Sequence, residues 1–381
     1  MIRIRSSSTR TPLTLIGRLF EINWLLFAIV YAIGTIGVIM IFAATDGVWS
    51  QGAGQHLMRL IFGGVVMLAV ALIDIKVWYH LAYPLYALAL LALAAVDFFG
   101  ITVNGSQRWL DLQFMRIQPS EIMKVAIALA LARYYHDLPS RDVSSPLGLL
   151  GVLVLIALPM QFILRQPDLG TTILLVVTGL TIVFLAGVRW RVIWGAMIGA
   201  MIVVPLFFKY GLKDYQRSRI QSLLSQDADP SGAGYHIIQS KIALGSGGVS
   251  GKGYMQGTQR QGEYVPENTT DFIFTVIGEE FGLIGCLVTI SIYGLLMALC
   301  LYLSAQVKHT FSRLLILGIT TTFALYVFIN LAMVMGLIPV VGVPLPLISY
   351  GGTVILAVMI GFGLILSANL YKQSELPRES D

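Results

Sequence analysis

The chain has very few charged residues for its length. Of its 381 residues, 12% are charged and 56% are hydrophobic. A soluble domain typically carries about 25% charged residues, because its surface must face water. The composition therefore excludes a water-soluble globular protein and predicts an integral membrane protein that is solvated mostly by lipid.

Cysteine is almost absent as well. The chain contains two cysteines, Cys286 and Cys300, and both lie in one apolar run. With a rise of about 1.5 Å per helical residue, about four turns separate them, which is too far for a disulfide. They therefore support no disulfide, metal or redox chemistry.

The sequence lacks a nucleotide-binding loop, although it contains a glycine-rich segment at Gly245–Gly253. Lys252 is followed by glycine, and Ser246 stands where a Walker loop has its first glycine. Composition favours a slack loop here, and the alternative is a set of backbone amides brought close to an anion. The net charge of +5 reflects mostly the flanks of apolar runs, so it does not indicate a nucleic-acid partner.

About ten charge-poor apolar runs occupy most of the chain. Each is near the ~20 residues with which a helix crosses about 30 Å of hydrocarbon, and lipid cannot satisfy an exposed backbone. The sequence therefore predicts an all-α polytopic bundle of about ten transmembrane helices, a single domain over residues 1–381 with a large extracytoplasmic loop at about 210–271. The runs are residues 22–45, 57–74, 77–97, 118–135, 147–165, 169–188, 192–209, 272–304, 312–336 and 348–371.

The distribution of cations predicts the orientation. An even number of spans places both termini on one side, which would hold thirteen lysines and arginines, against five in the short loops opposite. By the positive-inside rule both termini are cytoplasmic and the long loop is outside. The five outer cations are Arg59, Arg108, Arg116, Lys124 and Arg165.

Asp271 is the most prominent candidate for a working group. The segment Tyr264–Phe274 ends the long polar loop and begins an apolar run, so Asp271 lies where water, headgroups and hydrocarbon meet. A carboxylate at such a boundary either caps a helix or takes part in chemistry. Both interpretations stay open from the segment alone.

Two similar tetrapeptides begin helices on the outer side. Gln118-Pro119-Ser120-Glu121 and Gln166-Pro167-Asp168-Leu169 both place proline in the first turn with an acid beside it. For Asp168, capping is the favoured interpretation. Glu121 is followed one turn later by Lys124, so a structural pair and a functional pair are about equally supported.

The outer loops contain three further candidate surfaces. A basic cluster of Lys209, Lys213, Arg217 and Arg219 would either snorkel to lipid phosphates or capture a phosphorylated headgroup. The stretch 235–244 predicts an interfacial helix. The segment 339–353 contains three prolines that forbid a regular helix. It is either a stiff re-entrant turn or a wall of a cavity. Ser349 lies within it, but no His and Asp accompany it in the sequence in a pattern that would indicate a nucleophile.

Together these motifs resemble the SEDS family (shape, elongation, division and sporulation proteins) over about residues 20–371. Gly257-Thr258-Gln259 favours the elongation type over the division type. In one departure, Thr269 stands where the family usually has histidine, while Asp271 stays in register. The other matching segments are Arg108-Trp109, Gln118–Glu121 with Lys124, Gln166–Thr171, Lys241–Gly253, Pro266-Glu267, Thr270–Phe274 and Pro344–Gly352.

The resemblance implies a peptidoglycan glycosyltransferase of the bacterial cytoplasmic membrane that polymerises lipid II on the outer face during cell elongation. It places the essential carboxylate at Asp271, with Glu121 and Lys124 in supporting roles. It also implies a class B penicillin-binding protein as partner, among other membrane proteins of the elongation machinery. Gly361–Gly363 and the glycines of the eighth run are candidate contacts for a single-span partner helix.

These considerations give a mechanistic hypothesis. Asp271 is the base that activates the acceptor hydroxyl, and Arg108, Lys124, Arg217 and Arg219 hold diphosphate oxygens, with or without Mg²⁺ or Mn²⁺ and without an organic cofactor. Glu121 orients Lys124 or binds that cation, and the other candidate substrate-binding residues are Trp109, Lys241 and Ser349. The alternatives are a lipid II flippase and a non-enzymatic membrane scaffold.

Overall fold

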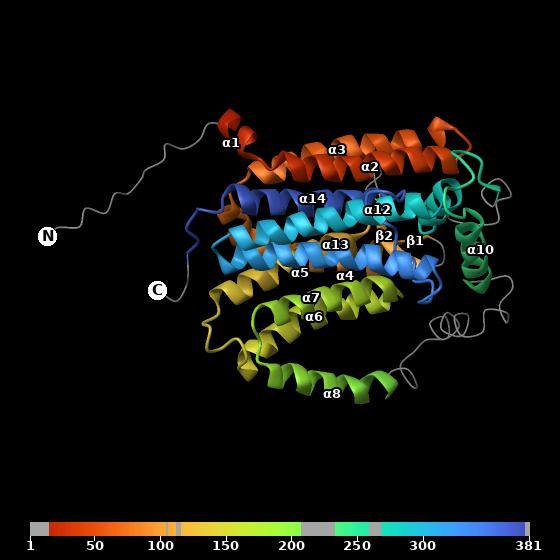
Figure 1. Cartoon of the computed structure of the whole chain (residues 1–381). Helices are drawn as coiled ribbons and strands as arrows, with labels where there is room; N and C mark the ends of the chain where they lie inside the picture. Colours follow the sequence, from red (N-terminus) through yellow and green to blue (C-terminus); the bar gives the residue numbers. More distant parts are fainter. Residues whose placement is uncertain (1–14, 104–105, 112–115, 207–232, 259–267, 378–381) are drawn as a thin grey trace.

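The computed structural model describes residues 15–103, 106–111, 116–206, 233–258 and 268–377. Its long helices run side by side as a bundle, and the first and last described residues lie at the same end (Figure 1). Every predicted apolar run contains one helix. The helices are α2 (Trp24–Ala44), α3 (Ala53–Leu72), α4 (Ile75–Phe99), α5 (Pro119–Asp137), α6 (Pro146–Arg165), α7 (Leu169–Leu185), α8 (Trp190–Leu206), α12 (Ile273–Gln306), α13 (Thr310–Val334) and α14 (Gly352–Leu370).

Seven of these helices are long and apolar enough to cross a membrane: α2, α3, α4, α6, α12, α13 and α14. The helix α7 is apolar but has only 17 residues, and α8 is equally short. The helix α5 carries Glu121, Lys124, Arg133 and Asp137. The predicted multi-pass helical membrane architecture is therefore confirmed, whereas the count of ten spans is not.

Local chemistry explains where several helices begin. The side chain of Asp168 accepts from the Thr171 amide (3.0 Å) and caps α7, which confirms the predicted capping. Ser145 caps α6 in the same way, and Asn23 caps α2. Pro119 starts α5 at a position where its missing N–H would have had no helical partner.

A small antiparallel sheet joins α4 to α5 and was not part of the all-α prediction. Its strands are β1 (Ile101–Val103), β2 (Ser106–Asp111) and β3 (Arg116–Ile117), in the order β1-β2-β3. They are too short for a periodic hydrophobic pattern, so the sequence carried little signal for them. The Gln107 amide donates to the carbonyls of Val96 (3.1 Å) and Gly100 (2.9 Å), which fixes the sheet on the end of α4.

Helices α5, α13 and α14 form the centre of the bundle. The helix α14 packs against α3 and α13, and α5 packs against α4, α7 and α13. Gly363 lies so close to α3 that a Cβ there would stand 2.7 Å from the Met67 carbonyl oxygen. Gly361–Gly363 is therefore buried inside the chain, and the suggestion that it contacts a partner helix is wrong.

The glycine-rich segment lies against a break in α12. Gly282 has φ +63°, and the amides of Leu283 and Ile284 donate to the carbonyls of Gly248 (3.0 Å) and Val249 (3.1 Å). In the other direction, the amides of Lys252 and Gly253 donate to Glu279 and Glu280, both at 3.0 Å. The segment is therefore neither a slack loop nor an anion nest. Its glycines let two backbones approach closely enough to bond to each other.

The described residues also form three shorter helices: α1 (Leu15–Glu21), η1 (Trp49–Gln51) and α10 (Ala233–Ser246).

The packing of the glycine-rich segment predicts a strong effect of Gly251→Ala. The new Cβ would stand 2.1 Å from the Glu280 carbonyl oxygen, at a residue with φ +80°. We expect a loss of about 2–5 kcal/mol of unfolding free energy, from about 1–3 for overpacking and about 1–2 for the left-handed backbone. Thermal unfolding in detergent measures the effect. Gly245→Ala is the control, since no atom lies within 4 Å of its Cβ, and equal stability of both variants would contradict the prediction.

The helix α10 crosses the end of the bundle opposite the first and last described residues (Figure 1). It packs on α12 and α13, and it contains the stretch 235–244 for which a helix was predicted. Ser240 is fully buried and donates to the Val334 carbonyl (2.7 Å) at the end of α13. One end of the bundle thus carries α10, the small sheet and the proline-rich segment, and the other carries the first and last described residues.

Candidate functional site

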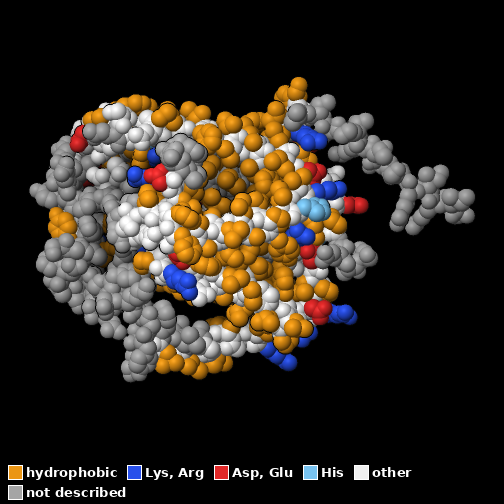
Figure 2. Space-filling model, turned by 180° about the vertical axis from the view of Figure 1, so that it is seen from behind, with side chains coloured by type: hydrophobic (Ala, Val, Ile, Leu, Met, Phe, Trp, Pro, Cys, Tyr) orange, Lys and Arg blue, Asp and Glu red, His pale blue; other side chains and the backbone are white. Residues whose placement is uncertain are grey.

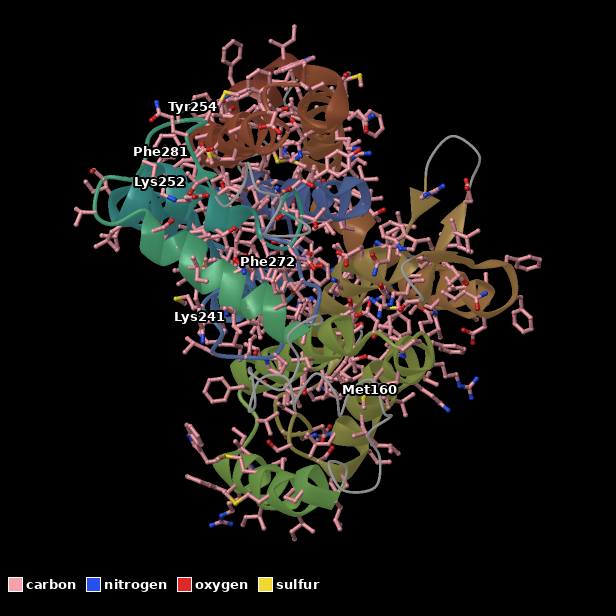
Figure 3. All side chains as sticks on the ribbon, turned by 90° about the vertical axis from the view of Figure 1, so that its right-hand side faces the viewer. Met160, Lys241, Lys252, Tyr254, Phe272 and Phe281 are labelled. Atoms are coloured by element: carbon pink, nitrogen blue, oxygen red, sulfur yellow. The ribbon has the colours of Figure 1, made fainter. Side chains whose placement is uncertain are left out.

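Asp271 lies in the turn that leads into α12. The N-cap position of α12 is occupied by Phe272 and not by Asp271, and the Phe272 side chain makes no capping hydrogen bond. The cap interpretation of Asp271 therefore has no support in the geometry. Figure 3 looks down on this end of the bundle and shows Phe272 near its centre, so the turn is surrounded by other elements.

Asn330 of α13 holds this turn in place. Its side-chain amide, fully buried, donates both to the Asp271 carbonyl (2.7 Å) and to the Val343 carbonyl (2.8 Å). Ser349 makes a second link, because its hydroxyl donates to the Thr270 carbonyl (2.5 Å) and accepts from the Leu345 amide (2.8 Å). The Asp271 turn and the proline-rich segment are thus fixed to each other and to α13.

The proline-rich segment forms a wall beside Asp271. As predicted, it has no regular helix between Gly336 and Gly351. Gly342 has φ +72°, and a Cβ there would lie 3.6 Å from Oδ2 of Asp271, so the carboxylate faces this glycine. Further anchors are the hydroxyl of Tyr293, which donates to the Pro346 carbonyl (2.5 Å), and His56, whose Nε2 lies 3.0 Å from the Leu347 carbonyl oxygen.

Glu121 and Lys124 form a buried ion pair at the start of α5. Nζ of Lys124 donates to Oε1 of Glu121 at 2.7 Å, and the two residues are 5% and 2% exposed. Tyr326 of α13 completes the group: its hydroxyl donates to Oε2 of Glu121 and accepts from Lys124. The Lys124 ammonium also lies 4.3 Å from the centre of the Tyr326 ring. Each charge is therefore paired inside the bundle.

Helix α13 connects this triad to Asp271. Tyr326 and Asn330 are four residues apart, so they share a face of α13 and are separated by about 6 Å along its axis. A cavity of about 30 Å³, large enough for a water molecule, borders the triad and reaches toward Gly361 of α14. The predicted pair and the turn of the predicted base are thus bound by side chains on neighbouring turns of α13.

Arg108 of β2 binds the second of the two similar tetrapeptides. Its guanidinium donates to the carbonyls of Gln166 (3.1 Å) and Pro167 (2.5 Å) and lies 3.5 Å from Asp168. Gln118 of the first tetrapeptide donates to the same Asp168 carboxylate at 3.3 Å. Arg108 therefore joins the sheet to the turn between α6 and α7, and its guanidinium is only partly available to a diphosphate.

The remaining predicted site residues are distributed unevenly. Trp109 is half-buried in β2 next to Arg108, and Lys241 is exposed on α10, toward the edge of this end (Figure 3). The buried hydroxyl of Ser349 is used in joining two segments, which favours a structural role. Arg217 and Arg219 lie outside the described residues.

The described residues form no ready-made cage for a divalent cation, and the predicted Mg²⁺ or Mn²⁺ stays a prediction. Within the described ranges, no three His, Cys, Asp or Glu side chains gather closely enough to hold a metal ion. Both carboxylate oxygens of Glu121 accept from Lys124 or Tyr326, and the ammonium would repel a second cation. These contacts favour the role of Glu121 in orienting Lys124 over its predicted role in binding a metal.

Three residues that build this end carry little signal in the sequence. Tyr326 and Asn330 are polar residues within a predicted apolar run. A polar side chain in such a run often has a buried partner, and this was the signal that could have identified them. Glu279 is 1% exposed and pairs with Lys252, with Nζ to Oε1 at 2.6 Å. That contact fixes the glycine-rich segment to the first part of α12. These partners are far apart in sequence, so local patterns could not pair them.

The fold and the site define a multi-pass membrane protein that gathers acids and bases at one end of a helical bundle. The chain belongs to the FtsW/RodA/SpoVE family, because the family model described as a cell cycle protein matches residues 23–374. The resemblance found in the sequence is thereby confirmed.

Similar proteins support this assignment. The chain is 45% identical to the peptidoglycan glycosyltransferase MrdB of Escherichia coli K12 over 86% of its length and 87% of that protein. It is 34% identical to the probable peptidoglycan glycosyltransferase FtsW of Trichlorobacter lovleyi over 92% and 93%. Two solved chains share the fold, each covering 93% of this chain and 99% of the other. One belongs to a peptidoglycan synthase complex (TM-score 0.81, 28% identity), and one is RodA of Thermus thermophilus (0.69, 25%).

Proposed function

We propose that this protein is a peptidoglycan glycosyltransferase that polymerises lipid II into β-1,4 glycan strands during cell elongation and maintenance of cell shape. The observation that carries the proposal is the 45% identity to the glycosyltransferase MrdB over 86% of the chain. The site adds physical support, because it holds one carboxylate in a fixed turn beside a buried acid–lysine pair.

The chemistry requires one base and stabilisation of a leaving diphosphate. In the proposed step the Asp271 carboxylate takes the proton of the acceptor hydroxyl, whose oxygen attacks the anomeric carbon of the donor sugar. The bond from that carbon to the diphosphate oxygen breaks, and the polyprenyl diphosphate leaves with the electron pair. A single direct displacement inverts the α-linked donor to a β linkage. Lys124, oriented by Glu121 and Tyr326, supplies positive potential for the diphosphate, together with Arg217 and Arg219.

A large apolar cavity offers a place for the polyprenyl chain. It has a volume of about 450 Å³ and lies between α3, α4, α5 and α14, below the small sheet. Its lining includes Trp78, Leu88 and Ile122, and Pro119 places it beside the first turn of α5. A lipid tail in this cavity would bring its diphosphate close to the end of the bundle where Glu121 and Lys124 lie.

In the proposed orientation, both termini are cytoplasmic and the site faces the outside. The first and last described residues lie at the same end of the bundle, opposite α10 and the sheet (Figure 1). Charged side chains gather at the end with the termini, and a broad apolar band covers the middle (Figure 2). The positive-inside rule assigns that charged end to the cytoplasm.

The proposed partner is a class B penicillin-binding protein with a single membrane span, within a larger set of elongation proteins. Supporting this, a solved relative comes from a complex that coordinates polymerization and crosslinking. An apolar groove on α12 includes Leu287, Ser291 and Leu295, and no atom lies within 4 Å of a Cβ built on Gly294. Small residues of this kind allow a second helix to approach closely in lipid.

Asn330→Ala is expected to lower the polymerisation rate about 100-fold. The variant removes the two hydrogen bonds by which Asn330 holds the Asp271 turn and Val343 of the proline-rich segment to α13. A displacement of about 1 Å at a base costs roughly that factor. Glycan synthesis from lipid II by the folded variant measures the loss. Asn369→Ala, at the other end of the bundle, is the matched control; an unchanged rate for Asn330→Ala would refute the clamp.

The experiment that tests the function uses the full chain in detergent with its penicillin-binding partner and lipid II. Glycan chains on a gel confirm the polymerase, and parallel samples with EDTA, Mg²⁺ or Mn²⁺ show whether a cation is required. A folded, partner-bound chain that makes no polymer would refute the proposal. Leaflet-resolved lipid II transport in vesicles then distinguishes a flippase from a scaffold.

A further inference from the structure

Leu347 has an unfavourable backbone conformation in the proline-rich segment beside Asp271. Its φ of +68° is left-handed, a region in which the Cβ of any residue other than glycine is crowded. Leu347 is 1% exposed, so other parts of the bundle enclose it. Backbone of this kind persists only where surrounding contacts hold it, and such positions concentrate at functional sites.

His56 of α3 provides a side chain that binds this residue. Its Nε2 lies 3.0 Å from the Leu347 carbonyl oxygen. Because a carbonyl oxygen only accepts, Nε2 carries the proton and donates it to this hydrogen bond. His56 is fully buried, so its ring does not reach a substrate. It can therefore act on a reaction only through the residues that it holds.

The backbone of α2 closes another side of this hydrogen bond. A Cβ on Gly37 would stand 2.6 Å from the Leu347 carbonyl oxygen and 2.9 Å from Nε2 of His56. The bond is thus enclosed between α2, α3 and the proline-rich segment. Without the histidine, the carbonyl would be buried with no donor, which is unfavourable. Loss of the donor should therefore displace the turn that contains Leu347.

Ser349 and Tyr350, which follow this turn, transmit its position to Asp271. The Ser349 hydroxyl donates to the Thr270 carbonyl at 2.5 Å. The Tyr350 amide donates to the Thr269 carbonyl at 2.9 Å. The two acceptors immediately precede Asp271 in the chain, so a displacement of the turn moves the backbone that carries the carboxylate.

Two other side chains of α3 contact the same part of the segment. The Arg59 guanidinium lies 4.4 Å from the centre of the Tyr350 ring, and the Tyr350 hydroxyl donates to Oε1 of Gln55. Both contacts involve the side chain of Tyr350. Of these three contacts from α3, the one from His56 is made to the backbone of the turn.

We propose that His56 is a positioning residue for the reaction: its hydrogen bond holds the left-handed turn at Leu347, and that turn holds the Asp271 carboxylate in place. The inference rests on the proposed function, because it concerns the position of the proposed base. The hydrogen bond acts on the geometry of the base and not on the substrate, so its loss lowers kcat and leaves KM unchanged. A misplacement of about 1 Å is enough to lower a rate about 100-fold.

Two substitutions separate the hydrogen bond from the volume of the ring. His56→Leu removes the donor, and we expect kcat for lipid II polymerisation to fall about 10- to 100-fold, with KM changed by less than about twofold. His56→Gln places an amide donor near the position of Nε2, so its rate should stay within about threefold of the wild type. His80→Leu is the control, because His80 is exposed and its ring bonds within its own helix.

Leu347→Gly tests the role of the left-handed backbone. Glycine adopts this region without a steric penalty, so the turn should depend less on the histidine. The loss of rate caused by His56→Leu should therefore be at least about fivefold smaller in the Leu347→Gly background than in the wild type. Comparing the two histidine variants within each background removes the effect of the lost leucine side chain.

Hydrogen exchange measures the position of the turn without any activity. The amides of Ser349 and Tyr350 should exchange at least about tenfold faster in His56→Leu than in the wild type and His56→Gln, while those of α5 stay unchanged. His56→Asn, whose shorter amide does not reach the carbonyl, replaces His56→Leu if that variant does not fold.

The two readouts distinguish failure of this inference from failure of the proposed function. A wild type that makes no polymer refutes the polymerase, and hydrogen exchange then decides whether His56 holds the turn. Equal exchange in all variants would overturn the inference. An unchanged kcat in folded His56→Leu, or equal losses in His56→Leu and His56→Gln, would also overturn it.

Discussion

Replacing Asp271 with alanine is expected to lower glycan polymerisation by about 100- to 10,000-fold, the usual contribution of a positioned general base. The backbone of the turn should stay in place, because Asn330 binds the Asp271 carbonyl and Ser349 binds the Thr270 carbonyl. The loss should therefore appear in the rate and not in the stability. Rates of lipid II polymerisation and thermal unfolding of the same samples measure the two effects separately.

Two further substitutions sharpen this test. Asp271→Asn keeps the shape and removes the base, so it should be as inactive as the alanine variant. Asp271→Glu keeps the base but displaces it by one methylene, so it should retain partial activity. Asp111→Asn, an acid on β2 that pairs with Arg116 at 3.7 Å, is the control. Wild-type rates for Asp271→Ala would remove the base from the mechanism.

Lys124→Ala is expected to destabilise the protein by about 3–5 kcal/mol and to abolish polymerisation. It leaves the Glu121 carboxylate buried at 5% exposure without its ammonium partner, and removing one member of a buried pair carries about that cost. Thermal unfolding in detergent and lipid II polymerisation measure the two losses. Tyr326→Phe, which removes one hydroxyl from the triad, should have a smaller effect on stability.

A double variant separates the structural from the functional role of the pair. Glu121→Gln combined with Lys124→Met removes both charges and keeps similar volumes, so it should recover much of the lost stability. If stability returns and polymerisation does not, the positive charge of Lys124 is needed by the substrate. Recovery of both properties would mean that the pair only supports the fold.

The membrane helices were predictable because each depends on a local property. A run of about 20 apolar residues specifies a helix in lipid whatever surrounds it. The starts of α5 and α7 were equally local, because Pro119 and Asp168 act on the turn that contains them. The short strands β1 to β3 were not predictable, because they depend on pairing with each other and on Gln107 bonding to the end of α4.

The candidate site was predictable only in part. Asp271, Glu121 and Lys124 stood out because charged residues near lipid are costly and rarely incidental. Their partners Asn330 and Tyr326 did not stand out, since nothing local shows which face of α13 points to the site. For Arg108 the sequence showed a cation near the site, and the structure shows that carbonyls of Gln166 and Pro167 take up much of its guanidinium.

The sequence by itself determined that the protein lies in lipid, where its helices are and which family it belongs to. Each of these depends on a local property: the apolarity of a run, the residues that start a helix, or the order of the motifs. The tertiary structure alone decided which groups meet: Lys124 with Tyr326, Asp271 with Asn330, and the glycine-rich segment with the break at Gly282. The physical reason is that hydrogen bonds and close packing act over a few ångströms. Residues separated by tens or hundreds of positions satisfy that condition only after helix rotation and packing bring them together.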